Sequence, residues 1–322
     1  MTRLTAALAF LICASPATAG EAPHFAQPVA CTIGTDCYIQ NYVDHDPSEA
    51  AATFQCGSLT YDGHKGTDFG LPSLAAMHQG VDVLAAAAGT VRGVRNDMRD
   101  MIYSDERAGE INGRDCGNGL VIAHGDGWET QYCHMQENSV TVLPGDQVQP
   151  GDVLGLVGLS GKTQFPHVHI SLRRDGLVVD PFAPDGSPAC DDQNGATLWD
   201  TPLATPQGGI LALGFSNGAP DYADVKAGTA AAQTLPRDAQ LVLWTYAFGA
   251  RADDILELSI DGPSGNLLLT EDIQTRNRAV FMRFGGLNPP SNGWPTGTYT
   301  GSVVIIRNGV EQDSQSTTFT FQ

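Results

Sequence analysis

Short apolar runs separated by glycine-rich turns restrict the fold of this chain more than any other feature of its sequence. Runs of this length and spacing predict an antiparallel β architecture for residues 57–185. A long polar loop, residues 95–115, interrupts the pattern, and long loops in compact domains often form functional rims or lids. The runs are Val81–Leu84, Gly89–Val94, Leu120–Ala123, Val140–Leu143, Val153–Val157, Val168–Leu172 and Leu177–Val179.

A second β-rich pattern follows residues 186–209, a segment with several Pro, Gly and Asp that we interpret as a linker. The segment Leu256–Ile260 alternates apolar and polar residues, which is the period of a strand with one buried face. Asn308-Gly309 is a strong hairpin signal. We therefore expect residues 210–322 to form an immunoglobulin-like β-sandwich. The whole chain is predicted to be all-β, with two domains in 322 residues.

Residues 1–19 have the pattern of an export signal. Arg3 supplies a positive charge, a short apolar stretch follows, and Ala17-Thr18-Ala19 fits a cleavage site. The stretch is too short to span a bilayer comfortably, so a membrane anchor or a buried first helix is the less favoured alternative. We expect an exported protein, periplasmic or secreted, with no membrane insertion after cleavage. Residues 20–56 are irregular and are predicted to form an ordered arm before the core.

Six cysteines remain once the predicted signal, with Cys13, is removed. An even number in an exported chain indicates disulfides, although six cysteines allow 15 pairings. Two pairs follow from the local sequence: Cys31 and Cys37 flank a short turn, and Cys116 and Cys133 flank a predicted hairpin. Cys56 and Cys190 remain as the third pair. Free buried cysteines and metal ligands are the alternatives, but without a Cys-x-x-Cys pair a thiolate zinc site is disfavoured. The predicted disulfides are Cys31–Cys37, Cys116–Cys133 and Cys56–Cys190.

The charge of the chain excludes one class of partner. Lys and Arg total 17 against 36 Asp and Glu, which gives a formal net charge of −19. Such a surface repels the phosphates of nucleic acids, so we expect no nucleic acid partner. It also disfavours docking on anionic lipid.

Five residues have spacings that suit a metal site. His64 and Asp68 are four residues apart with a glycine between them, so both can reach one cation. His167 and His169 are two apart in a predicted strand, so both rings point to one face. His134 ends another predicted strand. Zinc prefers imidazole and carboxylate ligands, but each motif alone is weak, because a lone histidine is more often a surface or satisfied core residue.

Taken together, the motifs resemble in their order the M23 family of zinc metallopeptidases, the lysostaphin- and LytM-like endopeptidases. The resemblance covers Tyr61–Phe182, somewhat more than a third of the chain. Its specificity comes from separate motifs that occur in the expected order. The matching segments are His64–Phe69, Ala85–Val91, Gly117–Gly125 with Tyr132–Met135, Pro144–Val148 with Gly155–Gly158, and Pro166–His169.

The resemblance implies a role for each of the five residues. His64, Asp68 and His169 match the ligands of one zinc ion, and His134 and His167 match the two catalytic histidines. It further implies a secreted zinc metalloendopeptidase that hydrolyses peptide bonds of peptidoglycan stem peptides or cross-links, with a zinc-bound water as nucleophile. Which histidine is the general base stays open.

Other functions remain compatible with these residues. Some family members lack ligands and act as non-catalytic wall-binding or amidase-activating modules, whereas here all five positions are occupied. An exported peptidase that acts on proteins is a third interpretation. The arm could cover the site and keep the enzyme latent. The C-terminal part has three open roles, which are wall targeting, binding of a regulatory protein, and stabilisation of the core.

Overall fold

The computed structural model describes residues 22–186, 190 and 196–322. The expected signal, residues 1–19, and part of the expected linker lie outside the described residues. Strand is the dominant regular structure and all the strand pairings within the sheets are antiparallel, so the predicted all-β fold class is confirmed. Within the described ranges, no helix is long and apolar enough to cross a membrane.

The regular elements are short, and helices are few. The helices are α1 (Leu74–Gln79), the 3-10 helix η1 (Asp105–Arg107), α2 (Ala108–Ile111) and α3 (Tyr222–Ala227). The strands are β1 (Tyr38–Asn41), β2 (Thr67–Gly70), β3 (Asp82–Leu84), β4 (Gly89–Arg95), β5 (Asn118–Gly125), β6 (Trp128–Met135), β7 (Gln147–Val148), β8 (Val153–Leu156), β9 (His167–Arg174), β10 (Leu177–Val179), β11 (Gly209–Ser216), β12 (Leu241–Ala250), β13 (Ile255–Gly262), β14 (Gly265–Ile273), β15 (Arg278–Leu287), β16 (Gly297–Arg307) and β17 (Val310–Phe321).

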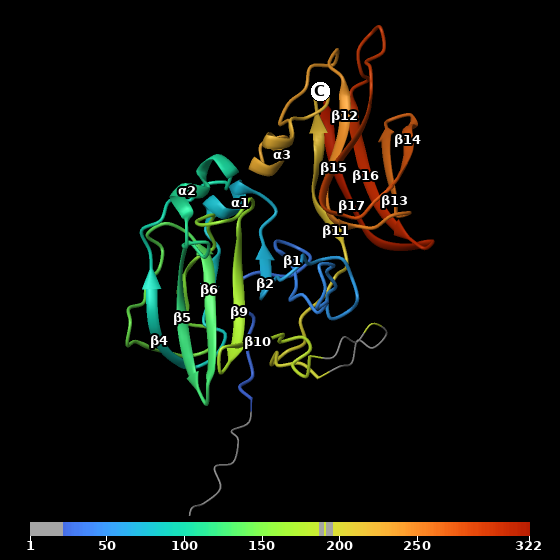
Figure 1. Ribbon diagram of the computed structural model, residues 1–322. Helices are drawn as coiled ribbons and strands as arrows, with labels where there is room; N and C mark the ends of the chain where they lie inside the picture. The colour runs from blue at the N-terminus through green and yellow to red at the C-terminus, as the bar shows by residue number, and fades with distance from the viewer. Residues whose placement is uncertain (1–21, 187–189, 191–195) are drawn as a thin grey trace, which may run out of the picture.

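One large antiparallel sheet positions the five candidate residues. Its order is β1-β2-β9-β6-β5-β4-β7, with β10 paired to β9 (Figure 1). The register places Asp68 of β2 opposite His169 of β9, and Cys133 of β6 opposite the same histidine. Strands β2, β9 and β6 therefore bring together motifs that lie more than a hundred residues apart in the chain.

The predicted arm contributes to this sheet. Its strand β1 pairs with β2, and the register shifts between Ile39 and Asn41. Ile39 and Tyr42 are fully buried in the same hydrophobic cluster as the core strands. The expectation of an irregular arm is therefore only partly met, because this stretch supplies the edge strand that flanks the first metal motif.

One expected strand is absent. Residues 140–143 form no strand in the structure, although the chain passes beside β8 there. Thr141 makes the contact, since its backbone N–H donates to the Leu154 carbonyl and its hydroxyl donates to the Val153 carbonyl. A single residue with bonds of this kind does not make a ladder.

The C-terminal part consists of two antiparallel sheets, with orders β11-β12-β15 and β14-β13-β16-β17, which share one hydrophobic cluster (Figure 1). The expected hairpin is present between β16 and β17. Asn308 and Gly309 both have positive φ, 52° and 76°, as a type I′ turn requires. The helix α3 of this part contacts α1 of the first. That this pair of sheets is immunoglobulin-like stays a prediction, as do the domain boundaries.

Three disulfides connect the pairs that the sequence predicts. They join Cys31 to Cys37, Cys56 to Cys190 and Cys116 to Cys133, with Cα–Cα distances of 6.0, 5.1 and 4.7 Å. The third joins Cys116, two residues before β5, to Cys133 of β6, which directly precedes His134.

Candidate metal and catalytic site

Three of the candidate residues converge on one point. His64 precedes β2, Asp68 lies in β2 and His169 lies in β9. The Oδ1 atom of Asp68 lies 2.7 Å from Nδ1 of His169 and 3.2 Å from Nε2 of His64. The same two ring nitrogens are 3.2 Å apart. These three potential ligand atoms form a compact cluster of the kind that holds a metal ion.

Contacts from the arm orient two of these side chains. His64 donates through Nδ1 to the carbonyl oxygen of Tyr42 over 2.7 Å, because that oxygen can only accept. In its neutral form the ring then presents the lone pair of Nε2 to the cluster. The other carboxylate oxygen of Asp68, Oδ2, accepts a hydrogen bond of 2.7 Å from the side-chain amide of Asn41. Partners of this kind fix the orientation of metal ligands.

The electrostatics of the cluster fit a divalent cation. Burial alone raises the pKa of Asp68, but the nearby His64, His167 and His169 outweigh it and hold that pKa well below its usual range. The carboxylate is therefore ionised, and its Oδ1 atom faces Nε2 of His64. A cation bound between them satisfies both. Two imidazoles and one carboxylate with a position left for substrate are a ligand set that suits zinc.

Gly66 provides space for this arrangement. A Cβ atom at that position would lie 2.6 Å from the ring of His169 and 2.4 Å from the carbonyl oxygen of Ile170. The φ angle of Gly66 is not positive, so the residue serves close packing against β9 rather than a special turn. The glycine inside the His-x-x-x-Asp motif thus lets the two halves of the metal cluster meet.

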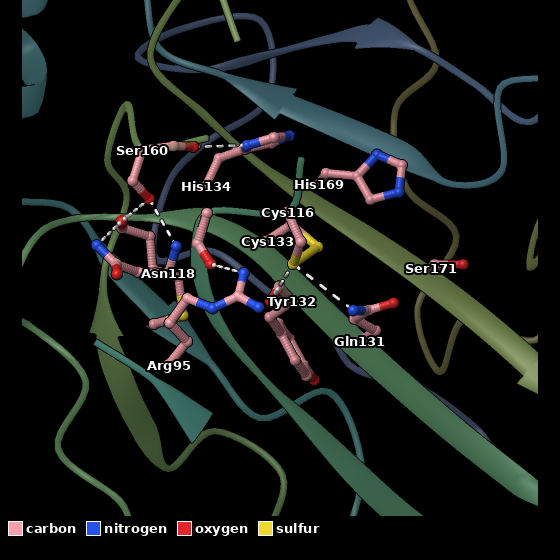
Figure 2. The surroundings of a disulfide bond; sticks show 12 residues. Arg95, Cys116, Asn118, Gln131, Tyr132, Cys133, His134, Ser160, His169 and Ser171 are labelled. Atoms are coloured by element: carbon pink, nitrogen blue, oxygen red, sulfur yellow. Dashed lines mark hydrogen bonds between the residues drawn. A yellow bond between two sulfur atoms is a disulfide. The ribbon is translucent and has the colours of Figure 1, made fainter. Parts of the chain in front are cut away.

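The other two histidines lie beside the cluster and are held in a common manner. His134 donates through Nδ1 to the carbonyl oxygen of Ser160 over 2.8 Å (Figure 2). His167 has its Nδ1 atom 3.0 Å from the carbonyl oxygen of Phe165, and its Nε2 atom lies 3.6 Å from Oδ1 of Asp68. The two ring centroids are 4.6 Å apart. The Nε2 atoms of both rings therefore stay available for proton transfer.

Both rings are neutral near pH 7. Burial lowers the pKa of His134 well below its usual value, and the neighbouring His167 and His169 lower it further. Burial also lowers the pKa of His167, against the opposing effect of Asp68. A neutral imidazole that donates through Nδ1 carries its lone pair on Nε2, so each ring can accept a proton there.

His134 has an unusual backbone conformation. Its φ angle is 63°, in the left-handed region that non-glycine residues seldom adopt. The backbone N–H of His134 donates to the carbonyl oxygen of Cys116. The disulfide Cys116–Cys133 ties the same segments together one residue before His134 (Figure 2). Strained conformations of this kind persist where the surroundings hold them, often at functional sites.

The groups that orient the five side chains could not be predicted from the sequence motifs. Asn41 lies in the arm, and no motif marks it. The carbonyl groups of Tyr42, Ser160 and Phe165 carry no side-chain signal at all, since any residue supplies a carbonyl. Only the pairing of β1 with β2 brings Asn41 to Asp68.

We expect the substitution Asn41→Ala to weaken zinc binding by about 10- to 100-fold, the usual cost of losing a residue that orients a metal ligand. The reason is that Oδ2 of Asp68 loses its donor and the carboxylate is free to rotate. Competition with a chromophoric chelator measures the affinity. Asn266→Ala, an exposed position in the β13–β14 hairpin, is the matched control. Unchanged affinity in a folded Asn41→Ala protein would contradict the prediction.

Comparison with known proteins agrees with this geometry. Residues 62–181, which contain all five candidate residues, match the family model described as Peptidase family M23. This segment belongs to peptidase family M23. The resemblance stated from the motifs is therefore confirmed for the segment, and the C-terminal sheets lie outside it.

The M23 segment also aligns with curated relatives. It is similar to the DD-carboxypeptidase/endopeptidase Mpg of Neisseria meningitidis, with 34% identity over 107 residues, which cover 33% of this chain and 22% of the relative. It is similar to the peptidoglycan DD-endopeptidase ShyA of Vibrio cholerae, with 31% identity over 116 residues, which cover 36% and 21%. This chain thus spans about a fifth of the length of either relative.

Among solved structures, the chain is similar to the catalytic domain of the prophage-encoded M23 protein EnpA from Enterococcus faecalis. The identity is 26%, and the match covers 51% of this chain and 95% of that chain. The TM-score is 0.31, so this likeness carries no argument about function.

Proposed function

We propose that this chain is an exported zinc endopeptidase that hydrolyses peptide bonds of peptidoglycan stem peptides or cross-links. The observation that carries the proposal is the convergence of His64, Asp68 and His169 beside two neutral histidines. The substrate class follows from the M23 match and from the names of its relatives. Export is supported by the signal pattern and by three disulfides, which persist in oxidising compartments.

In this proposal His64, Asp68 and His169 hold one zinc ion. Zinc supplies Lewis acidity to such a site, which polarises a carbonyl and makes water more acidic. His134 and His167, each fixed through Nδ1, accept a proton at Nε2 and return it to the leaving amine. In its protonated state either ring also stabilises negative charge on the substrate oxygen. The contacts to Ser160 and Phe165 keep both rings aimed without further reorganisation.

Digestion of purified sacculi tests the proposal. We expect the wild-type protein to release soluble peptides that mass spectrometry identifies, and the His169→Ala variant to release none. Equal release by both proteins would reject the proposed site. Bound zinc with intact sacculi would favour the non-catalytic module, and cleavage of a glycine-rich protein with intact sacculi would favour a peptidase that acts on proteins.

A further inference from the structure

A second pocket lies on the long polar loop 95–115, which the M23 motifs do not explain. Its volume is about 210 Å³. We call it the loop pocket. Its apolar lining residues are Met98, Met101, Ile102, Tyr103 and Ile111.

The loop pocket is joined to the segment that positions the catalytic histidines. The backbone N–H groups of Met101 and Tyr103 donate to the carbonyl oxygens of Leu159 and Thr163, over 3.1 and 2.8 Å. Gly161 lines the pocket and directly follows Ser160, whose carbonyl oxygen accepts the hydrogen bond from His134. Figure 2 shows this contact of Ser160 with His134. The pocket and the catalytic centre therefore share one short stretch of chain.

The polar lining of the loop pocket is positively charged in an otherwise acidic protein. Arg99, Arg107 and Arg114 line it together with only two carboxylates, those of Asp97 and Glu110. The whole chain has a formal net charge of −19. A pocket with this excess of cations selects anions that most of the surface repels.

The three arginines differ in how far their charge is already neutralised. Arg107 lies 3.4 Å from the carboxylate of Glu110, in an exposed pair of small value. Arg114 donates to the backbone carbonyl of Glu110 over 2.6 Å, and it forms no ion pair with a carboxylate among the described residues. Arg99 is exposed and forms no hydrogen bond or ion pair with any other residue that the structure describes. Arg99 and Arg114 are therefore the groups available to a ligand.

We propose that the loop pocket binds an acidic side chain of the substrate peptide, one with a carboxylate at the end of an alkyl chain. The apolar lining suits the alkyl part, and the planar guanidinium groups suit the carboxylate, which they can contact through paired hydrogen bonds. The proposal rests on the proposed function and specifies its substrate. Peptides whose acidic groups are amidated bind this pocket less well, because an amide offers no charge and brings its own donors.

Two synthetic cross-linked stem-peptide dimers test this, one with free side-chain carboxylates and one with the same groups as primary amides. We expect wild-type kcat/KM to be about tenfold higher for the free carboxylate, as one charge-assisted contact can supply. Arg99→Gln and Arg114→Gln should each reduce this preference towards equality, mainly through KM and only for the carboxylate form. Arg92→Gln is the matched control, since Arg92 is exposed and pairs with Glu129 away from the pocket.

The outcomes separate this inference from the proposed function. If wild type cleaves both dimers without preference, the loop pocket does not bind the acidic side chain. The same conclusion holds if the preference survives in Arg99→Gln and Arg114→Gln. Either result rejects this inference and leaves the proposed function unaffected. Cleavage of neither dimer would reject the proposed function instead. In that case calorimetric binding of the carboxylate dimer decides, since the loop pocket requires tighter binding by wild type than by Arg99→Gln. Arg99 is exposed, and its side chain forms no hydrogen bond or ion pair within the part of the chain that the structure describes, so we expect its substitution to leave the fold intact.

Discussion

The substitution Asp68→Asn is expected to lower zinc affinity by more than about 100-fold, beyond the usual cost of losing an orienting residue. Asp68 is the only anionic member of the cluster, and its Oδ1 atom is the point on which both histidines converge. The asparagine side chain has nearly the same size and shape as aspartate, but it lacks the negative charge that a divalent cation requires. Zinc content after dialysis against a chelator, followed by a competition titration, measures the loss.

Asp62→Asn is the matched control for this experiment. Asp62 is exposed two residues before His64, so the same charge is removed from the same loop without touching the cluster. Circular dichroism shows whether both variants keep their β structure. Stoichiometric zinc at wild-type affinity in Asp68→Asn would exclude this residue as a ligand and remove the basis of the proposed metal site.

The substitution His134→Ala is expected to lower kcat by about 10²- to 10⁴-fold, the range for removal of a general acid–base group. Zinc should stay bound, because His134 is not one of the three residues that form the metal cluster. The combination of retained zinc and lost turnover separates a catalytic role from a ligand role. Peptide release from sacculi at saturating substrate, with zinc measured on the same sample, provides both readouts.

The control for His134→Ala is His78→Ala. His78 is exposed on α1 and belongs to no cluster among the residues that the structure describes. It therefore tests whether the loss of any histidine disturbs the assay. Full activity in His134→Ala would assign acid–base catalysis to His167 alone and reduce His134 to a structural residue.

Much of the site could be predicted because its residues form local motifs. A strand directs residues two apart to one face, so His167 and His169 had to lie together whatever the rest of the fold. The hairpin at Asn308-Gly309 is equally local, since both residues accept positive φ. The strand expected at Val140–Leu143 fails for the opposite reason. Val140 and Val142 pack against the core but Leu143 is exposed, and ladder pairing depends on a partner that only the folded chain supplies.

The contacts between the arm and the candidate metal ligands could not be predicted from local sequence patterns. Its irregular composition predicts a segment that could cover the site, and that hypothesis stays a prediction. In the structure Asn41 and the Tyr42 carbonyl contact the metal cluster from this segment. A deletion of the arm would therefore remove supports of the ligands as well as any cover, so point substitutions are the cleaner test of latency.

By itself the sequence determined which residues are candidates for a metal site. The motifs that contain His64, Asp68, His134, His167 and His169 resemble, in their order, those of an M23-type zinc site, and ligand type and strand period are local properties. The tertiary structure alone decided how that site is held and what adjoins it. Strand pairing brings Asn41 to Asp68, and the loop pocket forms only where the 95–115 loop docks beside Ser160. Such contacts join residues distant in the chain, and their register depends on packing that no short motif encodes.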